Sequence, residues 1–250
     1  MFYDTHAHLD MLTEKEFKEA LIKAEQSGIE RLISCSTSFA SNAKNLALAK
    51  NFPQIKAAIG LYPLDTMELN SEELKKAFSY FKSKAREENV AAIGEVGLDY
   101  KYAKKTEEQE KQLNVFRKFI QLSNETEKPI IVHSRFAQKQ VLETLIDEKA
   151  EKVLLHSFVD SEKLMMKAAE QGFFVSVGLA ILQNEQIQKN ITAFPMENLL
   201  FETDSPMRFN GEKAFPHKLL ENAAKVAELK KISLKEVEAQ QEKNFKKLFL

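Results

Sequence analysis

The chain has 250 residues, of which 44% are apolar, so it is long enough to bury a large hydrophobic core. Its 36 basic and 37 acidic side chains nearly cancel, which excludes the strongly cationic field of a dedicated nucleic-acid-binding protein. The single cysteine, Cys35, excludes an intrachain disulfide and zinc sites built on cysteine pairs. Any metal must therefore be held by histidine and carboxylate side chains.

The N-terminal residues and the apolar runs predict where the protein acts. Residues Met1 to Asp4 lack the basic and apolar regions of a signal peptide. The longest nearly apolar run, Phe173 to Leu182, is too short to cross a bilayer. A single cysteine also fits a reducing compartment. We therefore expect a cytoplasmic protein that has no membrane partner and shows no sign of an obligate protein partner.

Short apolar, β-rich runs recur along the chain and predict eight strands. In chain order they are Phe2 to His6, Arg31 to Ser36, Ile55 to Leu61, Val90 to Glu95, Pro129 to His133, Lys152 to His156, Phe173 to Val177 and Leu199 to Asp204. The segments between them are amphipathic and carry helix start and stop signals. These signals are capping boxes at Thr13 with Glu16, Thr106 with Gln109 and Ser233 with Glu236, and a glycine after the first helix, Gly28.

The alternation of strands and helices predicts a parallel sheet with right-handed crossovers. Eight such units in 250 residues are typical of a (β/α)8 TIM-type barrel, which we expect to form a single domain over residues 1–250. An open, doubly wound sheet is the alternative. The first predicted strand is not followed by the glycine-rich fingerprint that often marks such a sheet, so the barrel is favoured.

Most of the histidines follow predicted strands. Of the five in the chain, four lie at or just beyond strand ends: His6, His8, His133 and His156. Glu95 and Asp204 end two further strands. Because the carboxyl ends of all strands of a barrel meet at one face, we expect these six side chains to converge there.

Each of these residues alone has a structural explanation, since a histidine at a strand end often only forms hydrogen bonds and an aspartate often caps a helix. Together they predict a metal site suited to ions such as Zn2+, Mn2+ or Fe2+. His6 and His8 are two residues apart and so point the same way from a strand. Asp4 and Glu202 lie one layer deeper, where they either orient the ligands or form a polar plug in the core.

Six ligands are too many for one tetrahedral ion and suit two ions that share a carboxylate. Such a pair of ions stabilises both the attacking and the leaving oxygen of a displacement, which predicts the hydrolysis of an ester or a phosphodiester.

The motifs that carry these residues resemble the TatD-like metal-dependent hydrolases, a family of amidohydrolase-type barrels commonly described as deoxyribonucleases. The resemblance runs the length of the chain. It rests on the segments Asp4 to Asp10, Gly94 to Tyr100, Ile131 to Arg135, Leu155 to Phe158, Glu202 to Pro206 and Asn244 to Phe249.

The resemblance implies two divalent ions, Mg2+, Mn2+ or Zn2+. It implies that His6, His8, Glu95 and Asp204 bind one ion and that Glu95, His133 and His156 bind the other. Glu95 would then bridge the two ions. A metal-bound hydroxide would attack the substrate, and Asp204 would act as both ligand and proton acceptor.

For the substrate we expect DNA or a nucleotide-like phosphodiester. Arg135 and Tyr62 are the predicted contacts to phosphate, although an arginine at a helix start and a tyrosine packed against a loop are the structural alternatives. The family usually has Gly-x-His-Pro-His after the third strand, where this chain reads Gly60 to Leu64 with Tyr62 and Leu64 in place of the histidines. Hydrolysis of an amide, a lactone or an aminoacyl ester therefore remains the alternative, followed by a non-catalytic, metal-containing binding protein.

Overall fold

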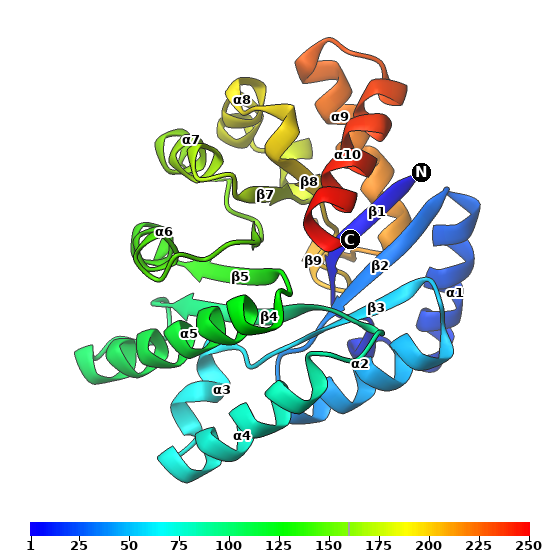
Figure 1. Ribbon diagram of the computed structural model, residues 1–250. Helices are drawn as coiled ribbons and strands as arrows, with labels where there is room; N and C mark the ends of the chain where they lie inside the picture. Colours follow the sequence, from blue (N-terminus) through cyan, green and yellow to red (C-terminus); the bar gives the residue numbers. More distant parts are fainter. Residues whose placement is uncertain (160) are drawn as a thin grey trace. The chain divides into compact units, whose positions relative to one another are not determined.

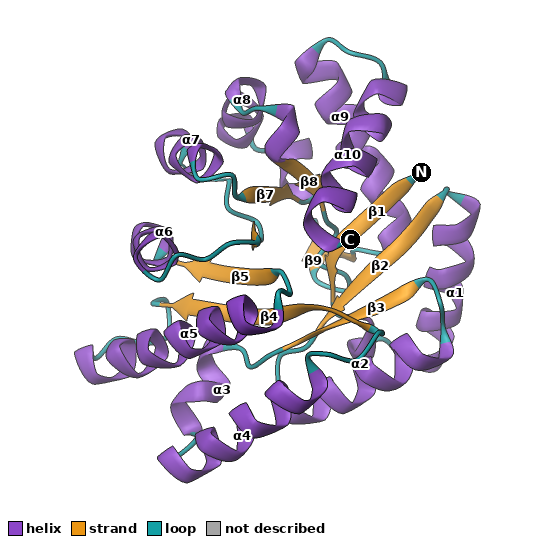
Figure 2. Ribbon diagram, viewed as in Figure 1, coloured by secondary structure: helices purple, strands orange, loops and turns teal. Residues whose placement is uncertain are grey.

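Parallel strands alternate with helices in the computed structural model, which describes residues 1–159 and 161–250 (Figures 1 and 2). The strands follow one another in the order β1 to β8. Their bounds are β1 Phe2–Ala7, β2 Ile29–Cys35, β3 Ile55–Ile59, β4 Val90–Asp99, β5 Ile130–Arg135, β6 Val153–Leu155, β7 Phe174–Val177 and β8 Leu199–Phe201. Eight parallel strands alternating with helices define the (β/α)8 barrel class, so the predicted fold class is confirmed.

The helices lie between these strands and after the last of them. They are α1 Glu14–Gln26, α2 Phe39–Asn51, α3 Pro63–Glu68, α4 Ser71–Lys84, α5 Thr106–Thr126, α6 Gln138–Asp147, α7 Glu162–Glu170, α8 Glu185–Ala193, α9 Leu219–Lys230 and α10 Leu234–Phe249. Short 3-10 helices occur at Leu9–Met11, Leu179–Leu182, Met196–Asn198 and Pro216–Lys218. A small hairpin of β9 Arg208–Phe209 and β10 Glu212–Lys213 follows β8.

All eight predicted strands are present, but some of their ends were wrong. β4 continues four residues past Glu95, to Asp99. β8 ends at Phe201, three residues before Asp204, and β6 ends at Leu155, before His156. In the last two cases the predicted strand included polar residues that belong to the following loop, which are Glu202 to Asp204 after β8 and His156 after β6.

The predicted helix signals are confirmed at three of the four positions. Thr13 and Ser233 form reciprocal capping boxes with Glu16 and Glu236. Gly28 has a φ of 71° just after α1, a left-handed conformation that glycine adopts without steric cost. The box predicted at Thr106 was wrong.

Thr106 is the first residue of α5, and the start of this helix is held by the Glu108 carboxylate and not by the Gln109 amide. Glu108 Oε2 accepts hydrogen bonds from the backbone N–H groups of Lys104 and Lys105, at 2.9 and 3.1 Å. A capping signal read from sequence can therefore be one residue out of register when neighbouring residues offer the same chemistry.

The chain falls into two compact units. The first unit comprises residues 1–34 and 156–250, and the second comprises residues 35–155. In the first unit, β1 pairs with β2 and lies beside β8. β8 in turn pairs with β7. In the second unit β3, β4, β5 and β6 pair in that order, and β4 and β5 run side by side in the same direction (Figure 1). The expectation of one domain over residues 1–250 stays a prediction.

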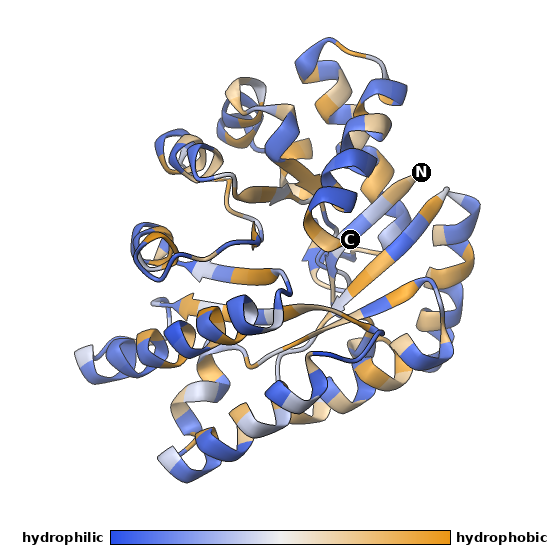
Figure 3. Cartoon of the chain, viewed as in Figure 1, coloured by the Kyte–Doolittle hydropathy of each residue, from blue (hydrophilic) through white to orange (hydrophobic). Residues whose placement is uncertain are grey.

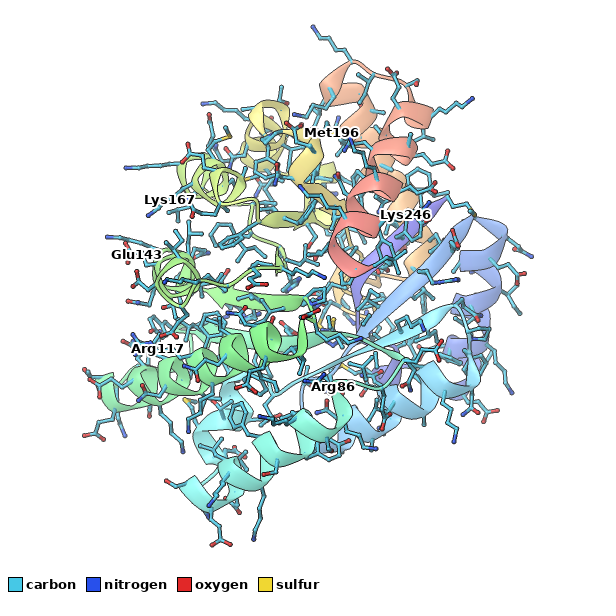
Figure 4. All side chains as sticks on the ribbon, in the orientation of Figure 1. Arg86, Arg117, Glu143, Lys167, Met196 and Lys246 are labelled. Atoms are coloured by element: carbon cyan, nitrogen blue, oxygen red, sulfur yellow. The ribbon has the colours of Figure 1, made fainter. Side chains whose placement is uncertain are left out.

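The apolar residues of strands β1 to β8 are buried beneath amphipathic helices. In β3, for example, Ile55, Ala57 and Ile59 have no solvent exposure. Hydrophobic and hydrophilic positions alternate along the helix ribbons (Figure 3). On α7, Met165 and Ala168 are buried while Lys167 is exposed (Figure 4). In the described part of the chain, none of the helices combines the length and the apolar character that a membrane-spanning segment needs.

Candidate metal centre

Three side chains of the first unit converge at the carboxyl ends of β1 and β8, with His6 inside β1 and His8 and Asp204 just beyond the strands. His6 Nε2 and His8 Nε2 lie 3.2 Å apart, because residues two apart in a strand point to the same side. Asp204 Oδ1 lies 3.6 Å from His6 Nε2 and 3.3 Å from His8 Nε2. The two histidines are buried, whereas the Asp204 side chain is 34% exposed.

The spacing of these three atoms fits a bound divalent ion. Ligand atoms that bind one ion at ~2.0–2.2 Å with bond angles near 90–110° lie roughly 3.0–3.6 Å from one another. The observed separations of 3.2, 3.3 and 3.6 Å fall in this range. His6, His8 and Asp204 are therefore a candidate metal-binding group.

His156 joins this group from the end of β6. Its ring stacks on that of His6, with centroids 3.8 Å apart and an interplanar angle of 9°. His156 Nδ1 lies 3.1 Å from both carboxylate oxygens of Glu202, and Glu202 also accepts a hydrogen bond from Ser176 Oγ. This contact fixes Nδ1 as the protonated nitrogen and leaves Nε2 as the atom that would bind a metal.

Glu202 thus contacts a predicted ligand, His156, and its role in orienting that ligand stays a prediction. Asp4 makes different contacts. Asp4 is fully buried and accepts hydrogen bonds from the backbone N–H groups of His6, at 3.3 Å, and Thr203, at 3.1 Å. It also accepts one from the Thr203 hydroxyl. Burial raises the pKa of Asp4 to about 8, although the hydrogen bonds from Thr203 oppose this rise. Asp4 thus holds the main chain beside Asp204 rather than a histidine ring.

Asp204 has an unusual backbone conformation. Its φ is 52°, in the left-handed region that aspartate tolerates better than most residues. Its N–H donates to His6 O at 2.9 Å, so the turn after β8 is tied to β1. Burial acts to raise the pKa of Asp204, but the hydrogen bond with His8 and the nearby histidines outweigh it and lower that pKa.

A second group of polar side chains lies in the second unit, around His133 on β5. His133 Nδ1 lies 2.9 Å from Glu95 Oε1, and His133 Nε2 lies 3.3 Å from Asp99 Oδ2. Glu95 and Asp99 are four residues apart on β4 and both are buried. Because Asp99 accepts the proton of one ring nitrogen, the other ring nitrogen and Glu95 form the pair of atoms suited to a metal.

Tyr62 belongs to this second group. Its hydroxyl donates to Asp99 Oδ2 at 2.8 Å and lies 3.0 Å from His133 Nε2. Burial and the bond to Asp99 raise the pKa of Tyr62, so the hydroxyl keeps its proton. Tyr62 therefore supports His133 through Asp99, and its predicted contact with a phosphate stays a prediction.

Gly97 allows β4 to approach His133 closely. Its φ is 140°, and a Cβ at this position would lie 2.1 Å from the backbone oxygen of His133. Any side chain would push the two strands apart, so the Gly97 position fixes the separation of Glu95 and Asp99 from β5.

Asp99 is a site residue that we did not predict from the sequence. We took β4 to end at Glu95, which assigned Asp99 to a loop. A signal was present nonetheless, since Glu95, Gly97 and Asp99 share the same parity along one strand. Arg135, the last residue of β5, is exposed, as a contact to substrate would require.

Histidines and carboxylates at the strand ends of a (β/α)8 barrel are the arrangement expected of a metal-dependent hydrolase. The family model for TatD related DNase matches residues 3–250. The chain therefore belongs to the TatD DNase family and is a metal-dependent hydrolase.

Individual relatives agree with this assignment. The chain is 31% identical to the uncharacterized metal-dependent hydrolase YabD of Bacillus subtilis, with 100% of this chain and 99% of YabD covered. It is 29% identical to the human deoxyribonuclease TATDN3, with 98% of this chain and 93% of the relative covered. The crystal structure of the TatD homologue YjjV from Escherichia coli has a TM-score of 0.89 and 25% identity, covering 99% of this chain and 97% of that chain.

Proposed function

We propose that this protein is a divalent-metal-dependent phosphodiesterase that cleaves DNA. The observation that carries the proposal is the convergence of His6 Nε2, His8 Nε2 and Asp204 Oδ1 at the spacing of atoms that share an ion. The relative TATDN3 is named a deoxyribonuclease, which supports the choice of DNA.

We further propose a centre of two ions, Mg2+, Mn2+ or Zn2+. His6, His8, Glu95 and Asp204 would hold one ion, and Glu95, His133 and His156 the other. Two features support this. The carboxyl ends of barrel strands open on one face, and His133 and His156 each have one ring nitrogen already engaged by a carboxylate.

When bound, the ions would polarise the phosphoryl oxygens and lower the pKa of a bound water. The Asp204 carboxylate would accept the proton of the attacking water, since its side chain reaches solvent while His6 and His8 are buried. Arg135 would hold a non-bridging phosphate oxygen, because its exposed guanidinium suits bidentate contact with an anion.

Glu202 and Asp99 act as positioning residues in this mechanism. Each accepts the proton of one ring nitrogen of a ligand histidine and thereby orients the other nitrogen. Tyr62 donates a hydrogen bond to Asp99 and so helps to hold the Asp99 carboxylate in place.

A specific observation favours a second function, the hydrolysis of an amide, a lactone or an aminoacyl ester. The Tyr62 hydroxyl donates to Asp99 and so does not offer its proton to a phosphate oxygen. A pair of ions that activates water for attack on phosphorus serves a carbonyl equally well.

Hydrolysis assays after metal removal separate the two functions. The stripped protein would receive Mn2+, Mg2+, Zn2+ or Co2+ and be offered bis(p-nitrophenyl) phosphate and a short single-stranded DNA. A p-nitroanilide and an acetyl ester would run in parallel. We expect metal-restored cleavage of both phosphodiesters. Cleavage confined to the anilide or the acetyl ester would replace the phosphodiesterase proposal with the second function.

A further inference from the structure

An exposed surface of cations and aromatic rings lies at the carboxyl ends of β4 and β5. We call it the strand-end surface, and it consists of Lys101, Tyr102, Lys104, Arg135 and Phe136. The Tyr102 side chain is 50% exposed and the Phe136 side chain is 73% exposed. The three cations are exposed as well.

The two loops of the strand-end surface are held together by backbone pairing. Asp99 and Arg135 are partners in the β4–β5 register, and Tyr100 N–H donates to Arg135 O at 2.8 Å. Tyr102 follows in one loop, and Phe136 follows directly in the other. Phe136 has a φ of 55°, a conformation that is rare for a bulky residue.

Two of the three cations lie over the Tyr102 ring, and the third lies at the base of the same loop. Lys101 Nζ is 5.6 Å and Arg135 Cζ 5.9 Å from the ring centroid, within the range of a cation–π interaction. Lys104 Nζ lies 3.4 Å from Tyr100 O, at the base of the same loop. The nearby acidic residue Glu108 accepts hydrogen bonds from the backbone N–H groups of Lys104 and Lys105, so its carboxylate caps the start of α5.

The exposed aromatic rings and cations of the strand-end surface are not explained by burial in a hydrophobic core. One exposed aromatic residue on a protein surface is ordinary. Two exposed aromatic rings among three cations are the composition of surfaces that bind unpaired nucleic acid strands, where bases stack on rings and cations contact phosphates. The same two strands carry Glu95 and His133, so a strand bound here would lie next to predicted metal ligands.

We propose that Tyr102 and Phe136 stack against unpaired bases of the DNA substrate, while Lys101, Lys104 and Arg135 contact its phosphates. This inference rests on the proposed function and adds to it the residues that bind the DNA strand. A duplex hides the faces of its bases, so the surface selects single-stranded ends over paired DNA.

Binding measurements test the proposal without cleavage. The full chain would be stripped of metal with EDTA, and the anisotropy of a fluorescein-labelled oligothymidylate would report binding. An oligonucleotide of the same length with abasic sites and a duplex would be compared. We expect the Tyr102→Ala, Phe136→Ala double variant to bind oligothymidylate roughly tenfold more weakly or worse, given the usual contribution of a stacked base.

The same variant should bind the abasic strand almost as the unchanged protein does, because its phosphates keep their cations. The aromatic replacement Phe136→Tyr should retain binding. Lys104→Ala should weaken the binding of both strands alike. Lys118→Ala is the matched control, since Lys118 also lies over an aromatic ring, that of Phe78, but on helix α5.

Equal loss on the normal and abasic strands, no loss on either, or no binding of oligothymidylate by the unchanged protein would overturn the proposal. Hydrolysis of bis(p-nitrophenyl) phosphate, which has no base, reports the proposed function separately. A protein that cleaves this diester but shows no base-dependent binding would keep the proposed function and lose the stacking surface.

Discussion

At the scale of single residues, buried carboxylates set the orientation of two predicted ligand histidines. His156 is fixed by Glu202 in the first unit, and His133 is fixed by Asp99 in the second. In both pairs the carboxylate is buried and bonded to a further hydroxyl, from Ser176 or Tyr62. The ring orientation is therefore set before any metal binds.

Asp99→Asn tests this positioning role. The neutral amide is a weaker acceptor for the histidine N–H than a carboxylate, and its NH2 group would face the Lys101 N–H that now donates to Asp99. We therefore expect metal affinity or metal-restored activity to fall ~10–100-fold, as when other such partners are lost. The measurement is the Mn2+ concentration that gives half-maximal hydrolysis. Asp147→Asn, at the exposed end of α6, is the matched control. An unchanged Mn2+ requirement in Asp99→Asn would refute the role of Asp99.

Glu95→Gln tests the proposed bridge. A neutral amide binds two cations poorly, so we expect kcat to fall by more than about 100-fold, beyond the loss of an indirect partner. The same change at exposed Glu88 should have no effect. Thermal unfolding should show Glu95→Gln folded, and near-normal turnover in that variant would exclude the two-metal mechanism.

At the scale of elements, α10 is bonded to the two strands nearest the predicted metal ligands His6 and Asp204, which are β1 and β8. Gln241 Nε2 donates to Tyr3 O in β1 at 2.6 Å. Asn244 Nδ2 donates to Leu199 O in β8 and to Met196 O, both at 2.7 Å. These bonds join the C-terminal helix to β1, which contains His6, to β8, which precedes Asp204, and to the 3-10 helix at Met196. The bonds to Tyr3 and Leu199 are buried.

Asn244→Ala should therefore destabilise the protein. The substitution removes the donor to the buried backbone oxygen of Leu199, which costs about 1–3 kcal/mol. The Met196 oxygen keeps the Leu199 N–H as a donor. Urea unfolding measures the loss, and exposed Lys243→Ala provides the comparison. A change below the error of the extrapolation would show that the helix is held mainly by its apolar face.

The strand ends show what the sequence could predict and what it could not. Apolar runs located all eight strands, because burial under helices leaves a strong pattern. Asp99 was missed because a strand that continues as Gly-Leu-Asp has no sharp end in sequence. Tyr62 and its hydrogen-bond partner Asp99 are 37 residues apart in the sequence. No local sequence pattern predicts a contact between residues so far apart.

At the scale of the whole molecule, metal binding should be linked to folding. An ion that binds only the folded protein stabilises it by about 2.7 kcal/mol at a hundred times its Kd. Calorimetry with and without Mn2+ should show a higher Tm with the ion. His8→Ala should lose most of this rise, whereas no rise in the unchanged protein would contradict a resident divalent metal.

Whether the protein unfolds cooperatively depends on its division into two units, because the fold class implies that both units share one sheet. A barrel sheet leaves no edge strand unpaired only when all of its strands are present, so half a barrel would expose strands that invite aggregation. We expect one unfolding transition, with equal calorimetric and van't Hoff enthalpies. For a chain of 250 residues the enthalpy near 60 °C should be about 175 kcal/mol, at roughly 0.7 kcal/mol per residue. Two resolved transitions, of which Mn2+ shifts only one, would mean that the units fold separately and that the ion is held by one of them.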